Sequence, residues 1–270
     1  LLDRLRAAGQ PPPLGLGLYV ACEVAKALHH AHKRGDDQHR PLGIIHGDPS
    51  PKNVLLSWDG EVKLGDFCTA PSLYDVRQAT VGVLARLAGK IAYGSPELVL
   101  GEPAGPTSDV FALGALLYEM LAGTQPFLAD SYAETLENVR TGKHAALRSV
   151  RGDVPEAVAD LVERALEVDP EKRGGSAARI YEELLSHAYA SGARFGAAEL
   201  ADLLERHRDP QPPPPETLLE QSQRIDTSPV MPPSPPKPAA SDSKPPLTRV
   251  ELADAREASA LVLRFSGSAP

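Results

Sequence analysis

From residue 44 the chain reads Ile44-Ile45-His46-Gly47-Asp48-Pro49-Ser50-Pro51-Lys52-Asn53. Two short apolar-rich runs follow, at 54–57 and 61–64, with Trp58-Asp59-Gly60 between them. An Asp-Gly step between two such runs is typical of a β-hairpin. The second run leads directly into Gly65-Asp66-Phe67-Cys68. The sequence therefore predicts a polar loop, a hairpin and a second polar turn in immediate succession.

This arrangement gathers oxygen-bearing side chains in one place. Asp48 and Asn53 lie five residues apart in the loop, and Asp66 is delivered at the far end of the hairpin. Each residue alone is better explained as a solvated loop residue or a turn former. Together they supply the hard oxygen ligands that magnesium and a phosphate-bearing substrate require.

These residues resemble the motifs of the protein kinase family, whose catalytic loop reads H-R-D-x-x-x-x-N and whose metal-binding turn reads D-F-G. The resemblance continues in order along the chain. The segment 95–97 stands where the family has A-P-E, and 108–114 looks like the central helix whose Asp, here Asp109, braces the catalytic loop. The segment 169–173 resembles the one whose Arg pairs with the Glu of A-P-E, so Glu97 and Arg173 are expected to form a buried ion pair.

The resemblance implies a role for each matching residue. Asp48 would be the catalytic base, and Asn53 and Asp66 would hold Mg²⁺ on the phosphates of ATP. His46 would be structural, as would the Asp109 brace and the Glu97–Arg173 pair. The implied fold is α+β: a protein kinase-like large lobe, mostly α-helical, with a short β-hairpin beside the catalytic loop.

Four positions depart from the family pattern. Gly47 replaces the Arg of H-R-D, which argues against activation by a phosphate on the activation segment. Cys68 replaces the Gly of D-F-G, which predicts a stiffer turn but leaves the ligand Asp66 in place. Ser50 stands where serine/threonine kinases carry a Lys, and Lys90 stands where they carry a Thr. We hypothesise that Lys90 and Ser50 have exchanged a cation and a hydroxyl, with both remaining catalytic.

Helical periodicity predicts the structure around this stretch. Apolar residues recur at helical spacing in 20–31, 110–121 and 158–166. Further helices are predicted at 132–140, 176–188 and 198–207.

Proline then divides the chain, because 13 of its 27 prolines fall between Pro210 and Pro246. Such a composition is typical of a linker with polyproline character. We expect three parts: an incomplete kinase domain at 1–208, a proline-rich disordered linker at 209–248, and a tail of unknown role at 249–270.

The residues before Leu18 do not contain the motifs with which a kinase domain begins. A kinase needs a Gly-rich strand–loop–strand, a strand Lys and a helical Glu, all of which would precede residue 18. Those residues instead contain Pro11-Pro12-Pro13 and Gly15-x-Gly17, which predict a loop. The expectation is a fragment from which the small lobe is missing. Such a chain would bind nucleotide weakly on its own and be inactive.

Composition excludes several classes of protein. A formal net charge of −8 and a pI near 5.5 remove the electrostatic footprint of nucleic-acid binding. Two cysteines cannot build a disulfide framework or a four-cysteine zinc site, and they fit a reducing compartment. No apolar run approaches the roughly 20 residues that span a bilayer. We expect a cytoplasmic protein with no membrane segment in this chain.

The predicted function is that of a bacterial-type serine/threonine protein kinase, with ATP and a protein substrate as partners. Tyrosine specificity is disfavoured because the loop after Asp48 lacks an Arg-Ala-Ala or Ala-Ala-Arg stretch. Two alternatives stay open. His46-Gly47-Asp48 also resembles the H-G-D loop of aminoglycoside and choline kinases, although Glu97 and Asp109 have no counterpart there. A pseudokinase or scaffold would keep the fold without catalysis.

Overall fold

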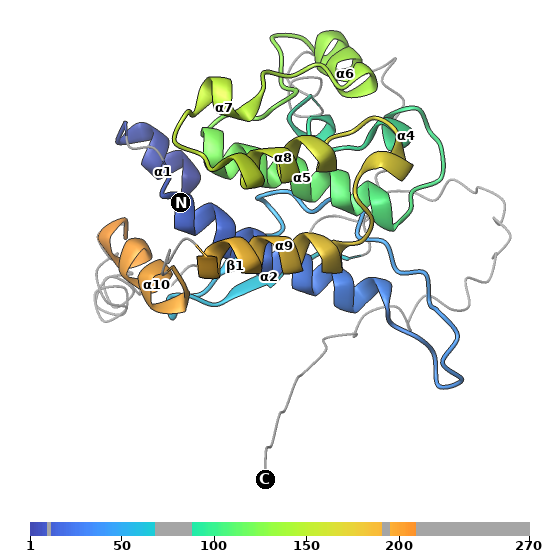
Figure 1. Ribbon diagram of the computed structural model, residues 1–270, viewed down its shortest axis with the longest axis horizontal. Helices are drawn as coiled ribbons and strands as arrows, with labels where there is room; N and C mark the ends of the chain where they lie inside the picture. The colour runs from blue at the N-terminus through green and yellow to red at the C-terminus, as the bar shows by residue number, and fades with distance from the viewer. Residues whose placement is uncertain (10–11, 68–87, 191–194, 209–270) are drawn as a thin grey trace, which may run out of the picture. The chain divides into compact units, whose positions relative to one another are not determined.

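A computed structural model describes residues 1–9, 12–67, 88–190 and 195–208 (Figure 1). All of them fall within the unit Leu1–Pro212. The described residues form many helices and one two-stranded antiparallel sheet, as predicted. Cys68, the whole of the predicted linker and the tail lie outside the described residues.

Helix α5, Pro106–Ala122, forms the centre of the core because it is buried on every side. Each residue from Ser108 to Leu121 is buried. The helix packs against α2 (Leu14–His32), α8 (Glu156–Ala165) and α9 (Ala177–Ala190). Its bounds follow from the sequence. Pro106 occupies the first turn, where a missing N–H costs nothing, and Gly123 ends the helix with φ +77°.

Helix α2 begins earlier than predicted. It starts at Leu14, directly after Pro13, and the expectation of a loop at Gly15 and Gly17 is therefore wrong. These glycines serve close packing: a Cβ on Gly15 would lie 2.6 Å from Phe195 Cβ. Helix α1, Leu2–Ala7, precedes α2 and was not predicted.

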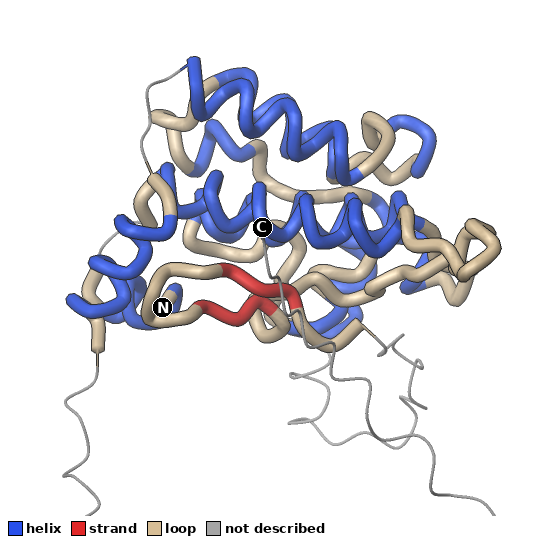
Figure 2. The backbone as a smooth tube through the Cα atoms, turned by 90° about the horizontal axis from the view of Figure 1, so that it is seen from below, coloured by secondary structure: helices blue, strands red, loops and turns tan. Residues whose placement is uncertain are grey.

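The hairpin is confirmed. Strands β1, Val54–Leu56, and β2, Val62–Leu64, pair antiparallel with Val54 opposite Leu64. Figure 2 shows the two strands in red beside the helices. Leu55 and Lys63 pair on the exposed face, whereas Val62 on the other face is buried and β2 contacts α2.

The remaining helices surround this core (Figure 1). The predictions at 132–140, 176–188 and 198–207 are confirmed to within two residues at each end. The elements not yet given are α4, Pro96–Val99; α6, Tyr132–Thr141; α7, Leu147–Val150; the 3₁₀ helix η2, Pro170–Lys172; and α10, Ala197–Arg206. Three short elements, α4, α7 and η2, have no periodic pattern of apolar residues in the sequence.

None of the helices in the described part of the chain combines the length and the apolar character needed to cross a membrane.

Candidate functional site

Asp109, near the start of α5, holds the backbone of the loop that carries Asp48. Its Oδ2 accepts a hydrogen bond from His46 N at 2.9 Å, and its Oδ1 accepts one from Gly47 N at 2.7 Å. His32 Nε2 lies 2.7 Å from the same Oδ2. The carboxylate is fully buried, so these donors stabilise a charge that water does not reach. Gly47 adopts φ +77°, a conformation that a glycine reaches without strain.

His46 joins this loop to the turn that carries Asp66. Its buried imidazole places Nε2 2.8 Å from the Gly65 carbonyl oxygen and Nδ1 3.2 Å from Asp48 N. A carbonyl only accepts and a backbone N–H only donates, so this geometry requires a neutral ring with its proton on Nε2. The ring also contacts Phe67, at 4.6 Å between centroids.

Asn53 lies where the loop meets the hairpin. Its Nδ2 donates to the Asp48 carbonyl at 2.7 Å, which turns Oδ1 away from the loop backbone. Its own carbonyl accepts from Gly65 N at 2.8 Å. Because this bond continues the β1–β2 ladder, the hairpin brings Asn53 and Asp66 to the same end. Asp66 adopts φ +58°, a left-handed conformation that is uncommon outside glycine.

These oxygens suit magnesium. Among the described residues, no three His, Cys, Asp or Glu side chains cluster as a metal site. The available donors are the Asn53 amide oxygen and the Asp66 carboxylate. Mg²⁺ is commonly held by one or two such groups, with substrate phosphates and water completing its shell. The residues present therefore fit a magnesium–nucleotide complex rather than a metal enclosed by protein ligands.

Asp48 lies beside Lys90. Lys90 Nζ is 3.6 Å from Asp48 Oδ2, and the side chains are 38% and 13% exposed, respectively. Ser50 is buried, and its N–H donates to the Asp48 carbonyl at 2.8 Å. The structure thus brings Lys90 to Asp48. Among the hydrogen bonds of the described residues, none joins Lys90 Nζ to the Ser50 hydroxyl.

Glu97 and Arg173 form a buried pair with two parallel hydrogen bonds. Arg173 Nη1 and Nη2 donate to the two Glu97 oxygens at 2.7 and 2.6 Å, and Ser108 Oγ donates to Glu97 at 2.6 Å. Arg173 is fully buried. Its remaining donors bond backbone carbonyls of Thr107, Glu167 and Val168. Burial alone would raise the pKa of Glu97, but the hydrogen bonds from Arg173 and Ser108 outweigh it and lower that pKa to about 2.

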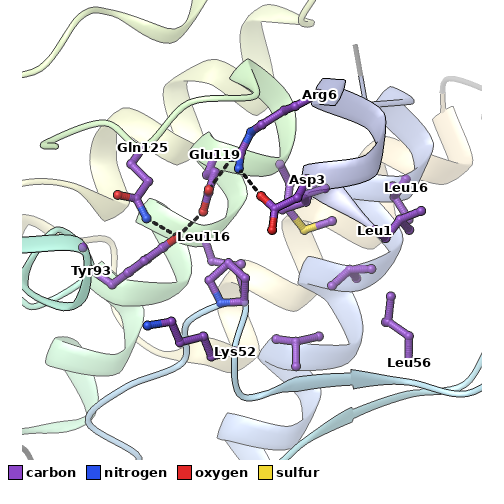
Figure 3. Close-up of a pocket in the computed structure, with 16 residues that line it drawn as sticks. Leu1, Asp3, Arg6, Leu16, Lys52, Leu56, Tyr93, Leu116, Glu119 and Gln125 are labelled. Atoms are coloured by element: carbon purple, nitrogen blue, oxygen red, sulfur yellow. Dashed lines mark hydrogen bonds and ion pairs between the residues drawn. The ribbon is translucent and has the colours of Figure 1, made fainter. Parts of the chain in front are cut away.

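A cavity of about 440 Å³ adjoins the loop (Figure 3). Lys52 and Gly89 line it on the side of Asp48 and Lys90, and apolar side chains of α2, α5 and β1 line much of the rest. Sequence reasoning missed this cavity because its walls come from segments far apart in the chain.

A network of polar side chains closes one wall of this cavity (Figure 3). Arg6 Nη2 lies 2.5 Å from the buried Glu119 carboxylate, which also accepts from the Tyr93 hydroxyl. Gln125 Nε2 donates to the same hydroxyl at 2.6 Å. Burial, and then the Glu119 charge, raise the pKa of Tyr93, so it stays a donor to Glu119. Arg6 therefore neutralises Glu119 from within the chain.

Comparisons with known proteins find a family model and several relatives that are all named as protein kinases. A family model described as protein kinase domain matches residues 17–190. The tyrosine-protein kinase MasK of Myxococcus xanthus is 31% identical over 206 residues, covering 75% of this chain and 31% of the relative. The probable serine/threonine-protein kinase CPE1738 of Clostridium perfringens is 32% identical over 172 residues, 64% of this chain and 24% of the relative.

A third relative is the serine/threonine-protein kinase PknB of Mycolicibacterium smegmatis. It is 34% identical over 167 residues, 62% of this chain and 25% of the relative. The chain thus spans between 24% and 31% of the length of these three proteins.

Proposed function

This chain belongs to the protein kinase family, and from that premise we propose that it contributes the catalytic loop and metal-binding residues of an enzyme that transfers the γ-phosphate of ATP to Ser or Thr hydroxyls of proteins. The observation that carries the proposal is the connected set of hydrogen bonds from Asp109 through His46 to Gly65. This set fixes Asp48 and the end of the hairpin relative to each other.

Asp48 is the proposed catalytic base. Its carboxylate is largely buried, and its backbone carbonyl is held by Asn53 Nδ2 and Ser50 N. A carboxylate fixed in this way can accept, or orient, the proton of an incoming hydroxyl. Positioning supplies much of the rate gain in phosphoryl transfer, so the held loop matters as much as the base itself.

Asn53 Oδ1 and the Asp66 carboxylate are the proposed ligands of Mg²⁺ on the ATP phosphates. When bound, the ion neutralises phosphate charge and orients the γ-phosphate. The chain's part is to hold these two oxygens at one end of the hairpin, through the Gly65 N to Asn53 O bond of 2.8 Å. Leu55, 59% exposed on the outer hairpin face, offers an apolar surface for the base of ATP.

Lys90 is the proposed cation at the transferring phosphate. It lies 3.6 Å from Asp48 and stands where serine/threonine kinases carry a Thr, whereas Ser50 stands where they carry a Lys. A fixed cation here stabilises charge that develops in the transition state.

The protein substrate is proposed to approach Asp48 from the side of Gly89, which lines the cavity. Ser and Thr are the favoured acceptors, since the loop after Asp48 reads Pro49-Ser50-Pro51-Lys52-Asn53 without the Arg and Ala residues of tyrosine kinases. The requirement for ATP fits a cytoplasmic setting.

The test is Asp66→Asn in the complete protein. The amide removes the negative charge that Mg²⁺–ATP needs, so phosphotransfer to a Ser/Thr peptide should fall to background while the circular dichroism spectrum stays unchanged. Asp59→Asn, in the exposed hairpin turn, is the matched control and should keep full activity. Near-normal turnover of Asp66→Asn would remove this residue from the metal site.

A further inference from the structure

Helix α10 lies beyond the family match and packs on the hairpin that ends at Asn53 and Asp66. The match stops at residue 190, and α10 begins at Ala197. Leu200 and Leu203 of this helix are buried in the hydrophobic core. Helix α10 is therefore an integral part of the fold.

The hairpin turn and α10 meet with no room between them. A Cβ built on Gly60 would lie 1.8 Å from the Ala197 carbonyl oxygen. This oxygen belongs to the backbone and cannot move aside as a flexible side chain could. Gly60 also adopts φ +82°, the left-handed conformation that favours glycine. The start of α10 thus rests directly on the turn.

Arg208, which follows α10, contacts the same turn. The Arg208 guanidinium lies 4.7 Å above the Trp58 ring, a cation–π contact. Arg4 of α1 donates to the His207 carbonyl. Both ends of α10 are therefore tied to segments distant in sequence.

Helix α2 supports the turn from inside. The Tyr19 hydroxyl donates to the Gly60 carbonyl at 3.2 Å, and the Tyr19 ring lies 6.4 Å from that of Phe195, just before α10. The turn is thus held between α2 and α10.

We propose that α10 is a positioning element which, by clamping the turn at Trp58–Gly60, keeps the opposite end of the hairpin in register. Strands of three residues each are marginal without support, so what holds the turn also orders the ladder up to the bond between Gly65 N and Asn53 O. The metal-binding role of Asn53 and Asp66 rests on the proposed function, whereas the clamp itself does not.

The experiment uses this chain and needs neither nucleotide nor activity. Trp58 is the single tryptophan of the sequence, so acrylamide quenching of its fluorescence reports the clamp. Hydrogen exchange of the Gly65 amide, measured by NMR, reports the far end of the hairpin. The variants are Leu203→Asp, which removes the buried anchor of α10, Arg208→Ala, and Arg208→Lys, which keeps the cation. Arg206→Ala is the control, because within the described part of the chain the Arg206 side chain bonds only its own helix, at Asp202 O.

Trp58 is 54% exposed in the fold, so Leu203→Asp and Arg208→Ala should both raise the rate at which acrylamide quenches it, and Arg208→Lys should return that rate toward the wild-type value. Leu203→Asp should also speed Gly65 exchange by about tenfold or more while the Leu117 amide in α5 stays slow. Arg206→Ala should change neither probe.

The positioning role is wrong if Trp58 is quenched faster while Gly65 exchange stays at its wild-type rate. It is equally wrong if the Leu117 amide accelerates as much as Gly65, since α10 would then stabilise the whole fold without acting on the hairpin. If Trp58 quenching is unaffected in both variants, the clamp itself does not exist. Failure of phosphotransfer in the complete protein would leave these readouts untouched.

Discussion

At the scale of single residues, the site depends on buried carboxylates that each accept several hydrogen bonds. Asp109 binds two backbone N–H groups and faces His32, whereas Glu97 binds Arg173 and Ser108. A buried carboxylate is tolerated only when its lone pairs are satisfied in this way. The two differ in what they hold, since Asp109 orients the loop backbone and Glu97 joins α4 to the end of η2.

The Glu97 pair predicts a stability change in acid. The pKa of Glu97 is about 2 in the folded chain against an ordinary value of 4.5, so folding is stabilised above about pH 4.5 and this contribution is lost as pH falls toward 2. Glu97→Gln should lower the unfolding free energy at pH 7 by about 3 kcal/mol, because it leaves the Arg173 charge unpaired. Its urea stability should also fall less steeply with acid than that of the wild type. Glu156→Gln, at an exposed glutamate, should show the wild-type slope, and an identical slope for Glu97→Gln would contradict this account.

The contact between Lys90 and Asp48 predicts a specific set of kinetic effects in the complete protein. Lys90→Ala should reduce turnover by about 10²-fold because a cation at the transferring phosphate is lost. Lys52→Ala, the nearby control, should do little. The double change Ser50→Lys with Lys90→Thr should recover activity that either single change loses. If Lys90→Ala is harmless, or the double variant is no better than the worse single one, the exchange of roles is wrong.

Some of these residues could be identified from the sequence and others could not. Asp48, Asn53 and Asp66 stand out because loop, hairpin and turn are adjacent in the chain. Distant partners outside the family motifs give no such signal: Arg6 meets Glu119 across 113 positions, and His32 meets Asp109 across 77. Long-range contacts of this kind are set by packing, which periodicity does not report.

At the scale of elements, Gly114 tests how tightly α5 packs. A Cβ at this position would lie 2.8 Å from Ala165 Cβ on α8, a short side chain that cannot move away. Gly114→Ala should therefore destabilise the fold by about 1–3 kcal/mol in urea unfolding, despite the better helix propensity of Ala.

Gly17→Ala is the comparison. Its Cβ would meet the flexible end of Leu121 at 2.9 Å, which can move, so the loss should be clearly smaller. A Gly114→Ala variant as stable as the wild type would mean that α5 and α8 are less closely packed than the structure has them.

The elements themselves were largely predictable, for identifiable reasons. Helices such as α8 have one buried face, which gives a clear period, and the hairpin has an Asp-Gly turn. The start of α2 was misjudged because glycine is usually a loop signal, whereas Gly15 and Gly17 make room for Phe195 and Leu121. Helices of four residues, such as α4 and α7, are too short to show a period.

At the scale of the whole molecule, the fold places a cavity beside the candidate catalytic loop. The chain itself neutralises the buried charge in the wall of this cavity. Glu119 is buried at its wall, but Arg6 of the same chain already pairs with it. The wall of the cavity that Glu119 forms therefore presents a paired carboxylate. Phosphotransfer by the complete protein distinguishes the proposed enzyme from a scaffold that keeps the fold without catalysis.

The most direct test of the central claim is phosphate transfer from γ-³²P-ATP to Ser, Thr and Tyr peptides by the complete protein, comparing the wild type with Asp48→Asn. The wild type should label Ser or Thr peptides in a Mg²⁺-dependent manner, and Asp48→Asn should reduce the rate by about 10²–10⁴-fold, the range for loss of a positioned general base. A folded wild type that labels none of the peptides, or an Asp48→Asn variant that turns over at the wild-type rate, would contradict the assignment of this loop as a phosphotransfer site.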